Sequence, residues 1–195
     1  MTEEFIDVLD EKGKHLGFSK PQAEVHRKGL WHAGVHIWIY NSKGEILLQK
    51  RSLKKKIRPG KWCVAVGGHV SAGEKPREAA VREAFEELGI KLKPSELQKA
   101  GRIKVSRFLP ELNGYKNEFN YVFLWKFDGK ISQLKINKKE IEKMKFVSLK
   151  KYEEEISNPE KRNNYVYHKE YFSKIIKILR KKTVNKRNPL ISLQC

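Results

Sequence analysis

GGHVSAGEKPREAAVREAFEELGI, residues 67–90, has the pattern of a glycine-rich loop followed by an unusually acidic helix. Pro76 suits the first turn of a helix, where a backbone donor is not needed. The residues from Ala79 to Leu88 are mostly good helix formers, and Gly89 follows at the position where helices commonly end. The stretch therefore predicts a loop and then a helix that begins near Pro76.

The predicted helix has two chemically different sides. At about 100° per residue, one side carries four apolar residues at core spacing: Val81, Ala84, Phe85 and Leu88. Glu83, Glu86 and Glu87 share the opposite side, where like charges destabilise a helix unless a cation neutralises them. Carboxylates without thiolates suit a hard cation such as Mg²⁺ or Mn²⁺. A solvated acidic face is the alternative that periodicity alone leaves open.

The spacing of the specified residues favours the metal site over the solvated face. Seven residues stand at fixed intervals and are followed by Ile90: Gly68, Glu74, Arg82, Glu83, Glu86, Glu87 and Gly89. At average residue frequencies, such a match arises by chance in a chain of this length on the order of once in a million. The stretch resembles a complete Nudix box, with Ala84 where that family prefers an aliphatic residue.

The resemblance implies hydrolysis of a diphosphate bond in a nucleoside diphosphate derivative, with two or three Mg²⁺ or Mn²⁺ ions. It assigns metal binding to Glu83, Glu86 and Glu87, one of which could also activate the attacking water. It implies that the Gly67 carbonyl is a further ligand, that Glu74 orients or shares a metal, and that Arg82 pairs with a box carboxylate.

Length and composition set the broad class of the protein. The 195 residues suffice for one well-buried domain with short appendages. Cys63 and Cys195 cannot form a disulfide framework, and no apolar run is long enough to span a membrane. Because the N-terminus begins acidic, it does not resemble a targeting peptide, and we expect a cytoplasmic protein.

The formal charge of +19 raises the question of a nucleic-acid partner. Ten of the 42 basic residues are Arg and the others are Lys, scattered along the chain. Arg is the usual choice for specific phosphate recognition, so a compositional bias is favoured over an RNA-binding surface. We expect a small polyanionic substrate; a homodimer is compatible with the sequence.

The order of apolar segments predicts an α+β fold. Strands are expected at 4–9, 15–18, 32–40, 45–51, 62–66, 97–109, 118–127 and 145–149, with 19–30 a loop or short helix and 110–116 a polar loop. Beyond the acidic helix, further helices are expected at 149–156 and 164–181. This order, with the Nudix resemblance over about residues 30–180, predicts an α/β/α sandwich with a mixed central sheet. We expect residues 1–29 to form a hairpin and connection, residues 30–181 to form the domain, and residues 182–195 to be a basic, mobile tail.

The flanking sequences are similar to the Nudix subgroup related to isopentenyl-diphosphate isomerase. The similarity rests on EFIDVLDEKG, EVHRKGLWH, EILLQKR, PGKW and GGHV. In that isomerase, histidines and glutamates hold a metal, and a cysteine works opposite a glutamate. The resemblance places His32 and His69 at two ligand positions, His26 near a third with a spacing off by one, and Glu118 at the acid–base glutamate.

Two departures count against isomerase chemistry. Gly67 stands at the position of the catalytic cysteine, and Cys63 lies too early in the segment to replace it. The partner ligand two residues before Glu118 is Lys116, whose charge repels a metal.

Several single residues have two explanations. His36 alternates with apolar neighbours, which indicates a packed histidine. His32 and His69 fit either structural hydrogen bonding or contact with substrate or metal. Arg51 could contact phosphate and Trp62 could stack on a base, although a solvated basic segment and a position in the core or a cleft wall are the favoured explanations. The sequence thus predicts a Nudix pyrophosphohydrolase, with an isomerase-like enzyme and an RNA-associated protein as alternatives.

Overall fold

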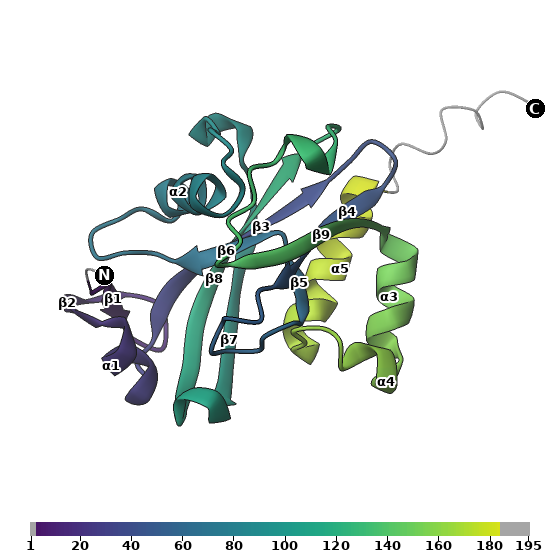
Figure 1. The fold of residues 1–195 in the computed structure, drawn as a ribbon. Coiled ribbons are helices and arrows are strands. Elements are labelled where there is room, and N and C mark those ends of the chain that lie inside the picture. Colours follow the sequence, from purple (N-terminus) through teal and green to yellow (C-terminus); the bar gives the residue numbers. More distant parts are fainter. Residues whose placement is uncertain (1–2, 184–195) are drawn as a thin grey trace, which may run out of the picture.

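A mixed seven-stranded sheet lies at the centre of the computed structural model, which describes residues 3–183 (Figure 1). The strands, in chain order, are β1 (Phe5–Leu9), β2 (His15–Pro21), β3 (His32–Tyr40), β4 (Glu45–Arg51), β5 (Trp62–Val64), β6 (Val66–His69), β7 (Gln98–Leu109), β8 (Gly114–Lys126) and β9 (Ile141–Ser148). The main sheet has the order β5-β4-β3-β8-β7, with β6 beside β3 and β9 beside β4. Strands β3 and β8 run parallel, whereas the other neighbours are antiparallel.

The helices are α1 (Gln22–Arg27), α2 (Pro76–Leu88), α3 (Leu149–Ser157), α4 (Pro159–Arg162) and α5 (Lys169–Thr183). Helix α2 covers one face of the sheet, and α3 and α5 cover the other (Figure 1). Short 3₁₀ turns lie at Pro94–Glu96, Pro110–Leu112 and Ile131–Gln133.

The alternation of side chains along β3 separates two apolar layers. Val35, Ile37 and Ile39 pack with Leu88 of α2 on one face of the sheet. Trp38, between them in sequence, belongs to the layer that α3 and α5 cover on the other face. Successive strand residues point to opposite faces, so one strand supplies both layers. The predicted α/β/α sandwich with a mixed sheet is therefore confirmed.

Strands β3 and β4 have the predicted bounds, but other elements differ from the prediction. The expected strand 62–66 divides at Ala65 into β5, which pairs with β4, and β6, which pairs with β3. Strand β8 begins at Gly114 instead of 118, because antiparallel pairing with β7 continues through residues expected to form a loop. The stretch 19–30 does contain a short helix, α1.

The last helix begins at Lys169, five residues later than the expected start at 164. Residues 164–166 instead run beside β5: the Trp62 N–H donates to the Asn164 carbonyl at 2.8 Å, and the Val166 N–H donates to the Trp62 carbonyl at 2.8 Å. A tertiary strand contact thus overrides the helical periodicity at this end. Helix α5 continues through Thr183, so the predicted tail does not begin at 182, and residues 184–195 lie outside the described part.

The N-terminal hairpin β1–β2 packs beside the loop that leads into α2 (Figure 1). The Leu9 N–H donates to the Trp31 carbonyl at 2.8 Å, and the Ala72 N–H donates to the Phe5 carbonyl at 2.9 Å. Through these bonds the first residues reach the neighbourhood of the acidic helix. Among residues 3–183, no helix is long and apolar enough to cross a membrane.

Candidate active site

Helix α2 begins and ends as its sequence requires. Pro76 occupies the first turn, and the Lys75 N–H donates to the Glu78 carboxylate at 3.3 Å. Gly89 adopts the left-handed conformation (φ 68°) that favours glycine after a helix, and its N–H donates to the Phe85 carbonyl at 2.9 Å. These ends place the acidic side of the helix beside β6 and the preceding loop.

Arg82 holds the loop and the helix together. Its Nε and Nη2 donate to the two oxygens of Glu74 at 3.0 and 2.9 Å, and Nη2 also donates to the His69 carbonyl at 3.0 Å. Its Nη1 donates to Glu83 Oε1 at 2.7 Å and lies 3.4 Å from Glu86 Oε2. A planar guanidinium can serve several carboxylates at once, so Arg82 fixes the acidic side chains relative to one another.

The three box carboxylates differ in burial. Glu87 is buried and accepts a hydrogen bond from Gln49 Nε2 at 3.0 Å, whereas Glu86 is exposed. Burial raises the pKa of Glu83 to about 7, against the lowering effect of Arg82. Burial and the neighbouring Glu83 raise the pKa of Glu87 well above its ordinary value. A buried and a largely buried carboxyl group that repel each other fit a hard divalent cation, which would favour their ionised forms.

The predicted division of the helix surface is wrong at Phe85 and Glu87. Phe85 was expected in the core and is 51% exposed, while Glu87 is buried beside the sheet. Ala80, Ala84 and Leu88 fill the core side instead. The core stripe is therefore rotated toward the carboxylates, because the acidic side faces a cavity at the sheet and not bulk solvent.

Two glycines of β6 allow this close approach. A Cβ added at Gly68 would overlap the Glu83 carboxylate, and one at Gly67 would lie 2.9 Å from His36 Cδ2. Gly68 opposes Val35 in the pairing of β6 with β3, so the backbone cannot shift away without breaking the sheet. The two glycines thus bring the backbone against the acidic side chains, and both line the cavity described next.

A cavity of about 1260 Å³ lies beside the acidic helix. Its lining includes the three box glutamates and Arg82 from the helix side. Cationic side chains from the opposite elements also line it: Arg51, Arg58, Arg107, Lys116 and the lysines at 54–56. Carboxylates at one wall and cations at the others suit an anionic substrate that binds through metal ions.

Glu118 lies at the floor of this cavity and is buried at 1% exposure. Its Oε2 forms an ion pair with Lys116 Nζ at 2.9 Å, and its Oε1 lies 3.8 Å from His32 Nε2 and 3.9 Å from His69 Nε2. Burial alone would raise the pKa of this carboxyl, but the positive charge of Lys116 lowers it below its ordinary value. Glu118 is therefore an ionised buried group.

His26, His32 and His69 form a cluster beside Glu118, with ring nitrogens within 4.8 Å of one another. The Nδ1 of His26 lies 3.3 Å from the Tyr115 carbonyl, and that of His32 lies 3.0 Å from the Leu30 carbonyl. The Nδ1 of His69 lies 2.9 Å from Gln22 Nε2. Burial lowers the pKa of all three, so neutral imidazoles result. The buried His32 Nε2 has no hydrogen-bond partner among the described residues. The ring nitrogens of this cluster are suited to bind a metal ion, whereas the positive charge of the neighbouring Lys116 would repel one.

Of the two other predicted site residues, Arg51 and Trp62, only Arg51 is part of the lining of the cavity. Arg51 lines the cavity, and its Nε donates to the Ile57 carbonyl at 3.0 Å. Trp62 does not line it: its ring packs in the apolar layer of α3 and α5, under Lys145 Nζ at 4.2 Å. The base-stacking role expected for Trp62 stays a prediction, and the Trp62 ring is not part of the lining of this cavity.

Sequence reasoning missed Glu4 and Gln49, and it assigned no role to Arg107. Glu4 lines the cavity near Arg82, and burial raises the pKa of its carboxyl. Gln49 binds Glu87, and Arg107 approaches from β7. No motif marks these residues; only the alternation of β4 and β7 could have placed two of them on a sheet face.

His36 and Cys63 also line the cavity. His36 is a packed histidine, as predicted, with Nδ1 2.7 Å from the Tyr171 hydroxyl, which accepts a second hydrogen bond from Trp38 Nε1 at 3.0 Å. Burial raises the pKa of the Cys63 thiol to about 12, so it is not a thiolate nucleophile at neutral pH.

Solved structures share this fold. The crystal structure of the Deinococcus radiodurans protein DR0079 has a TM-score of 0.68 at 20% identity and covers 91% of this chain and 98% of that one. A MutT protein from Methanosarcina mazei has a TM-score of 0.55 at 22% identity, covering 81% of this chain and 96% of that one. At these identities the likeness concerns the fold.

Curated relatives are more similar in sequence. Nudix hydrolase 3 of Arabidopsis thaliana is 43% identical over 130 residues, which cover 64% of this chain and 16% of that protein. An uncharacterized Nudix hydrolase of Clostridium acetobutylicum is 34% identical, with 72% of this chain and 68% of that one covered. An isopentenyl-diphosphate Delta-isomerase of Streptomyces griseus is 34% identical, with 61% of this chain and 59% of that one covered. The chain thus spans less than two thirds of two of these relatives.

A family model described as NUDIX domain matches residues 30–168, which is more than half of the chain. The matched region contains the acidic helix, the glycines of β6 and all of the strands β3 to β9. With the box residues gathered at one cavity and a Nudix hydrolase similar over most of its own length, the chain belongs to the Nudix hydrolase family.

Proposed function

We propose that the protein is a metal-dependent pyrophosphohydrolase that cleaves a phosphoanhydride bond in a nucleoside diphosphate derivative by water attack. The observation that carries the proposal is the buried Glu87 and the largely buried Glu83 beside the exposed Glu86, with Glu83 and Glu86 held by Arg82 at the wall of a cationic cavity. A solvated acidic face would leave all three carboxylates exposed to water.

Glu83, Glu86 and Glu87 would hold two or three Mg²⁺ or Mn²⁺ ions, with the Gly67 carbonyl as a further ligand. Bound at this site, such ions offset phosphate charge and lower the pKa of a coordinated water. Glu74 positions the ligands through Arg82, with which it forms two hydrogen bonds. Cations on the other walls, Arg51 among them, would bind the remaining phosphate charge.

The reaction forms a bond between the water oxygen and phosphorus and breaks the bond from that phosphorus to the bridging oxygen. A box glutamate accepts the proton of the water, and the leaving phosphate departs with the bridging oxygen and its electron pair. The residue that accepts the proton must be ionised. Bound cations would therefore have to lower the raised pKa values of Glu83 and Glu87 in the active state.

The proposal is tested by measuring phosphate and nucleotide release from nucleoside di- and triphosphates, dinucleoside polyphosphates, nucleotide sugars and capped RNA with Mg²⁺ or Mn²⁺. Glu86→Gln and Glu87→Gln should each lower kcat by about a hundredfold or more, with little loss of folding. The matched control is Glu154→Gln on the exposed surface of α3, which should keep wild-type turnover. Near-wild-type kcat in both box variants would contradict the proposal.

An isomerase-like activity is a second candidate, favoured by the histidine cluster around Glu118 and by the similarity to isopentenyl-diphosphate isomerases. Gly67 cannot supply a thiol, and the Cys63 thiol is protonated at neutral pH. Isopentenyl diphosphate incubated alone with the protein should therefore remain unchanged. Formation of its double-bond isomer, with no hydrolysis of the nucleotides, would replace the hydrolase proposal.

A further inference from the structure

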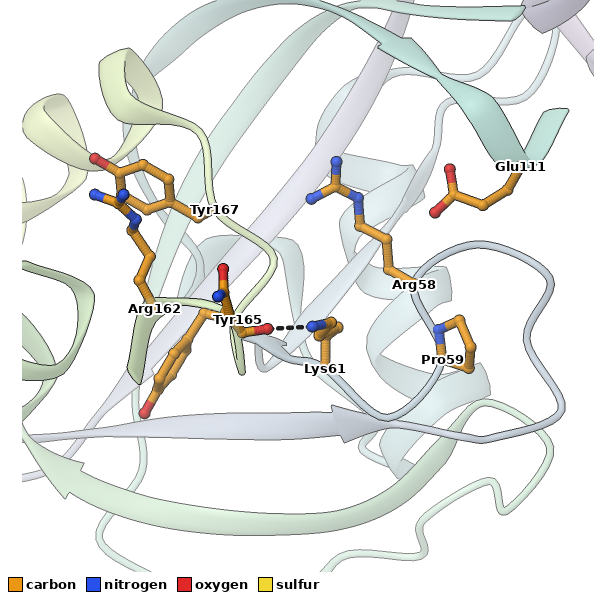
Figure 2. Close-up of a pocket in the computed structure, with 8 residues that line it drawn as sticks. Arg58, Pro59, Lys61, Glu111, Arg162, Tyr165 and Tyr167 are labelled. Atoms are coloured by element: carbon orange, nitrogen blue, oxygen red, sulfur yellow. Dashed lines mark hydrogen bonds between the residues drawn. The ribbon is translucent and has the colours of Figure 1, made fainter. Parts of the chain in front are cut away.

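A second cavity of about 500 Å³ lies outside the main one. Its lining includes three cationic side chains, two tyrosines and one carboxylate: Arg58, Lys61, Arg162, Tyr165, Tyr167 and Glu111 (Figure 2). We call it the outer cavity. Neither the box nor the histidine cluster contributes to it, so the roles proposed above leave it unexplained.

Arg58 joins the two cavities, since it lines both. Its backbone has φ 50°, in the left-handed region that side chains other than glycine rarely adopt. The turn is held by the Gly60 N–H, which donates to the Arg51 carbonyl at 3.1 Å, and by Arg51 Nε, which donates to the Ile57 carbonyl at 3.0 Å. A strained residue fixed by its surroundings points to a function for its position.

The cations around Arg58 outnumber the one carboxylate, Glu111, that lines the outer cavity with them. Within residues 3–183, Arg58, Lys61 and Arg162 form no ion pair with an acidic side chain. On the inner side, Arg107 carries a buried Nε without a hydrogen-bond partner among the described residues. Burial, with Arg58 and Arg51 as neighbouring charges, lowers the pKa of Arg107 to about 10. Like charges held together with an unsatisfied donor are stabilised when an anion binds between them.

The outer cavity also offers an aromatic surface. The Arg162 guanidinium lies over the Tyr167 ring, 4.7 Å from its centroid, on the side of Arg58 away from Glu111 (Figure 2). Tyr167 stacks on Phe172 at 5.0 Å and 17°, and Phe172 is buried and lines the main cavity. A planar cation and an aromatic ring fixed in this way can stack on a nucleobase of any identity, because every base has a π-face.

We propose that the outer cavity binds a second phosphorylated, ring-bearing group of the substrate, such as the distal nucleotide of a dinucleoside polyphosphate. This inference rests on the proposed hydrolysis in the main cavity. Arg58 and Arg107 contact the phosphates beyond the scissile bond, and Arg162 with Tyr167 contacts the distal ring. The protein therefore prefers substrates with two nucleosides over substrates with one at the same number of phosphates.

The test compares diadenosine tetraphosphate with adenosine tetraphosphate. Both have four phosphates, but the mononucleoside lacks the second adenosine and carries an additional charge on its free terminal phosphate. Arg162→Ala should raise KM for the dinucleoside about tenfold or more without changing kcat, and should leave KM for the mononucleoside unchanged. Tyr167→Leu, which keeps an apolar side chain, should act in the same direction. Lys177→Ala removes one charge from the exposed surface of α5 and should change neither substrate.

A binding measurement separates this inference from the hydrolase proposal. Equilibrium dialysis with AMP in EDTA reports the outer cavity without turnover, and binding should weaken in Arg162→Ala but persist in Glu87→Gln. If wild type hydrolyses none of the anhydrides but Arg162→Ala loses AMP binding, the hydrolase proposal would be refuted, and the outer cavity would still be a nucleotide site. Equal KM values for the two tetraphosphates, with AMP binding unaffected by Arg162→Ala, would overturn the inference.

Discussion

Individual carboxyl groups at this site differ because the fold buries them differently. Glu83 and Glu86 belong to one helix and share Arg82, yet Glu83 is largely buried and Glu86 is exposed. Burial makes the ionised form of Glu83 costly, and a bound cation makes it favourable. Metal binding and deprotonation of this group are therefore linked.

We expect metal-free protein to lose stability through Glu83 as the pH rises. The folded pKa of about 7 exceeds the ordinary 4.5, so the folded state holds the proton more tightly than the unfolded state between these values. The contribution to stability is complete below pH 4.5 and is lost through pH 7. In EDTA, Glu83→Gln should gain about 2 kcal/mol relative to wild type between pH 5 and pH 8, after allowance for solvent screening.

Thermal or urea unfolding of both proteins at the two pH values measures this difference. The histidines near the site titrate in both proteins, so their effects cancel in the comparison. Mn²⁺ should stabilise wild type more than the variant at pH 8. A constant difference across the pH range would show that Glu83 is not protonated in the folded protein.

Lys116 places one positive charge beside the histidine cluster, through its ion pair with Glu118. The Lys116 ammonium lies 2.9 Å from Glu118 Oε2. A metal ion near the three histidines would be attracted by the same carboxylate. We expect Lys116→Gln to strengthen Zn²⁺ binding about tenfold or more, because a repelling charge is removed and the Glu118 charge is released. Zn²⁺ retained after dialysis is the measurement, with His69→Ala added to Lys116→Gln as the control. Unchanged retention would show that Lys116 does not oppose the metal.

At the scale of elements, helix α2 packs directly against strand β6 because Gly68 has no side chain to keep them apart. The Glu83 carboxylate occupies the space that a side chain at Gly68 would need. Arg82 then connects the helix to Glu74 and to the His69 carbonyl in the intervening loop. The glycine and the arginine of the box are thus explained by packing and hydrogen bonding, and not by contact with substrate.

Gly68→Ala should therefore destabilise the protein by about 2 kcal/mol and abolish most activity, because the added methyl overlaps the carboxylate. Combining it with Glu83→Ala should restore the free energy of unfolding, since the overlapping group is gone, while activity stays lost. Urea unfolding and steady-state assays measure the two effects. A double variant no more stable than Gly68→Ala would show that the overlap is not the cause.

For the whole molecule, the dominant property is a formal charge of +19. Four of the positive charges, in the segment 54–58, line the main cavity, so we expect a polyanionic substrate to be attracted before it binds. Raising NaCl from 20 to 200 mM should lower kcat/KM for a nucleoside triphosphate about tenfold and leave kcat nearly unchanged. Initial rates at fixed Mg²⁺ measure this. A kcat/KM that is independent of salt would show that the positive surface serves another partner, and steeply salt-dependent RNA binding would identify RNA as that partner.

The sequence by itself determined the features that are local or periodic. The spacing of the box predicted α2 and its carboxylates, and the apolar runs gave β3 and β4 their bounds, because helix and strand periods are visible within a few residues. The start of α5 was misplaced, since pairing of residues 164–166 with β5 competes with the helical pattern.

Only the tertiary structure decided what faces the box. Parallel pairing of β3 with β8 places Glu118 opposite His32, and the N-terminal segment brings Glu4 to the same cavity. The exposure of Phe85 and the burial of Glu87 depend on how α2 is rotated against the sheet. These contacts join residues far apart in sequence, and their geometry follows from strand register and packing, which no short motif records.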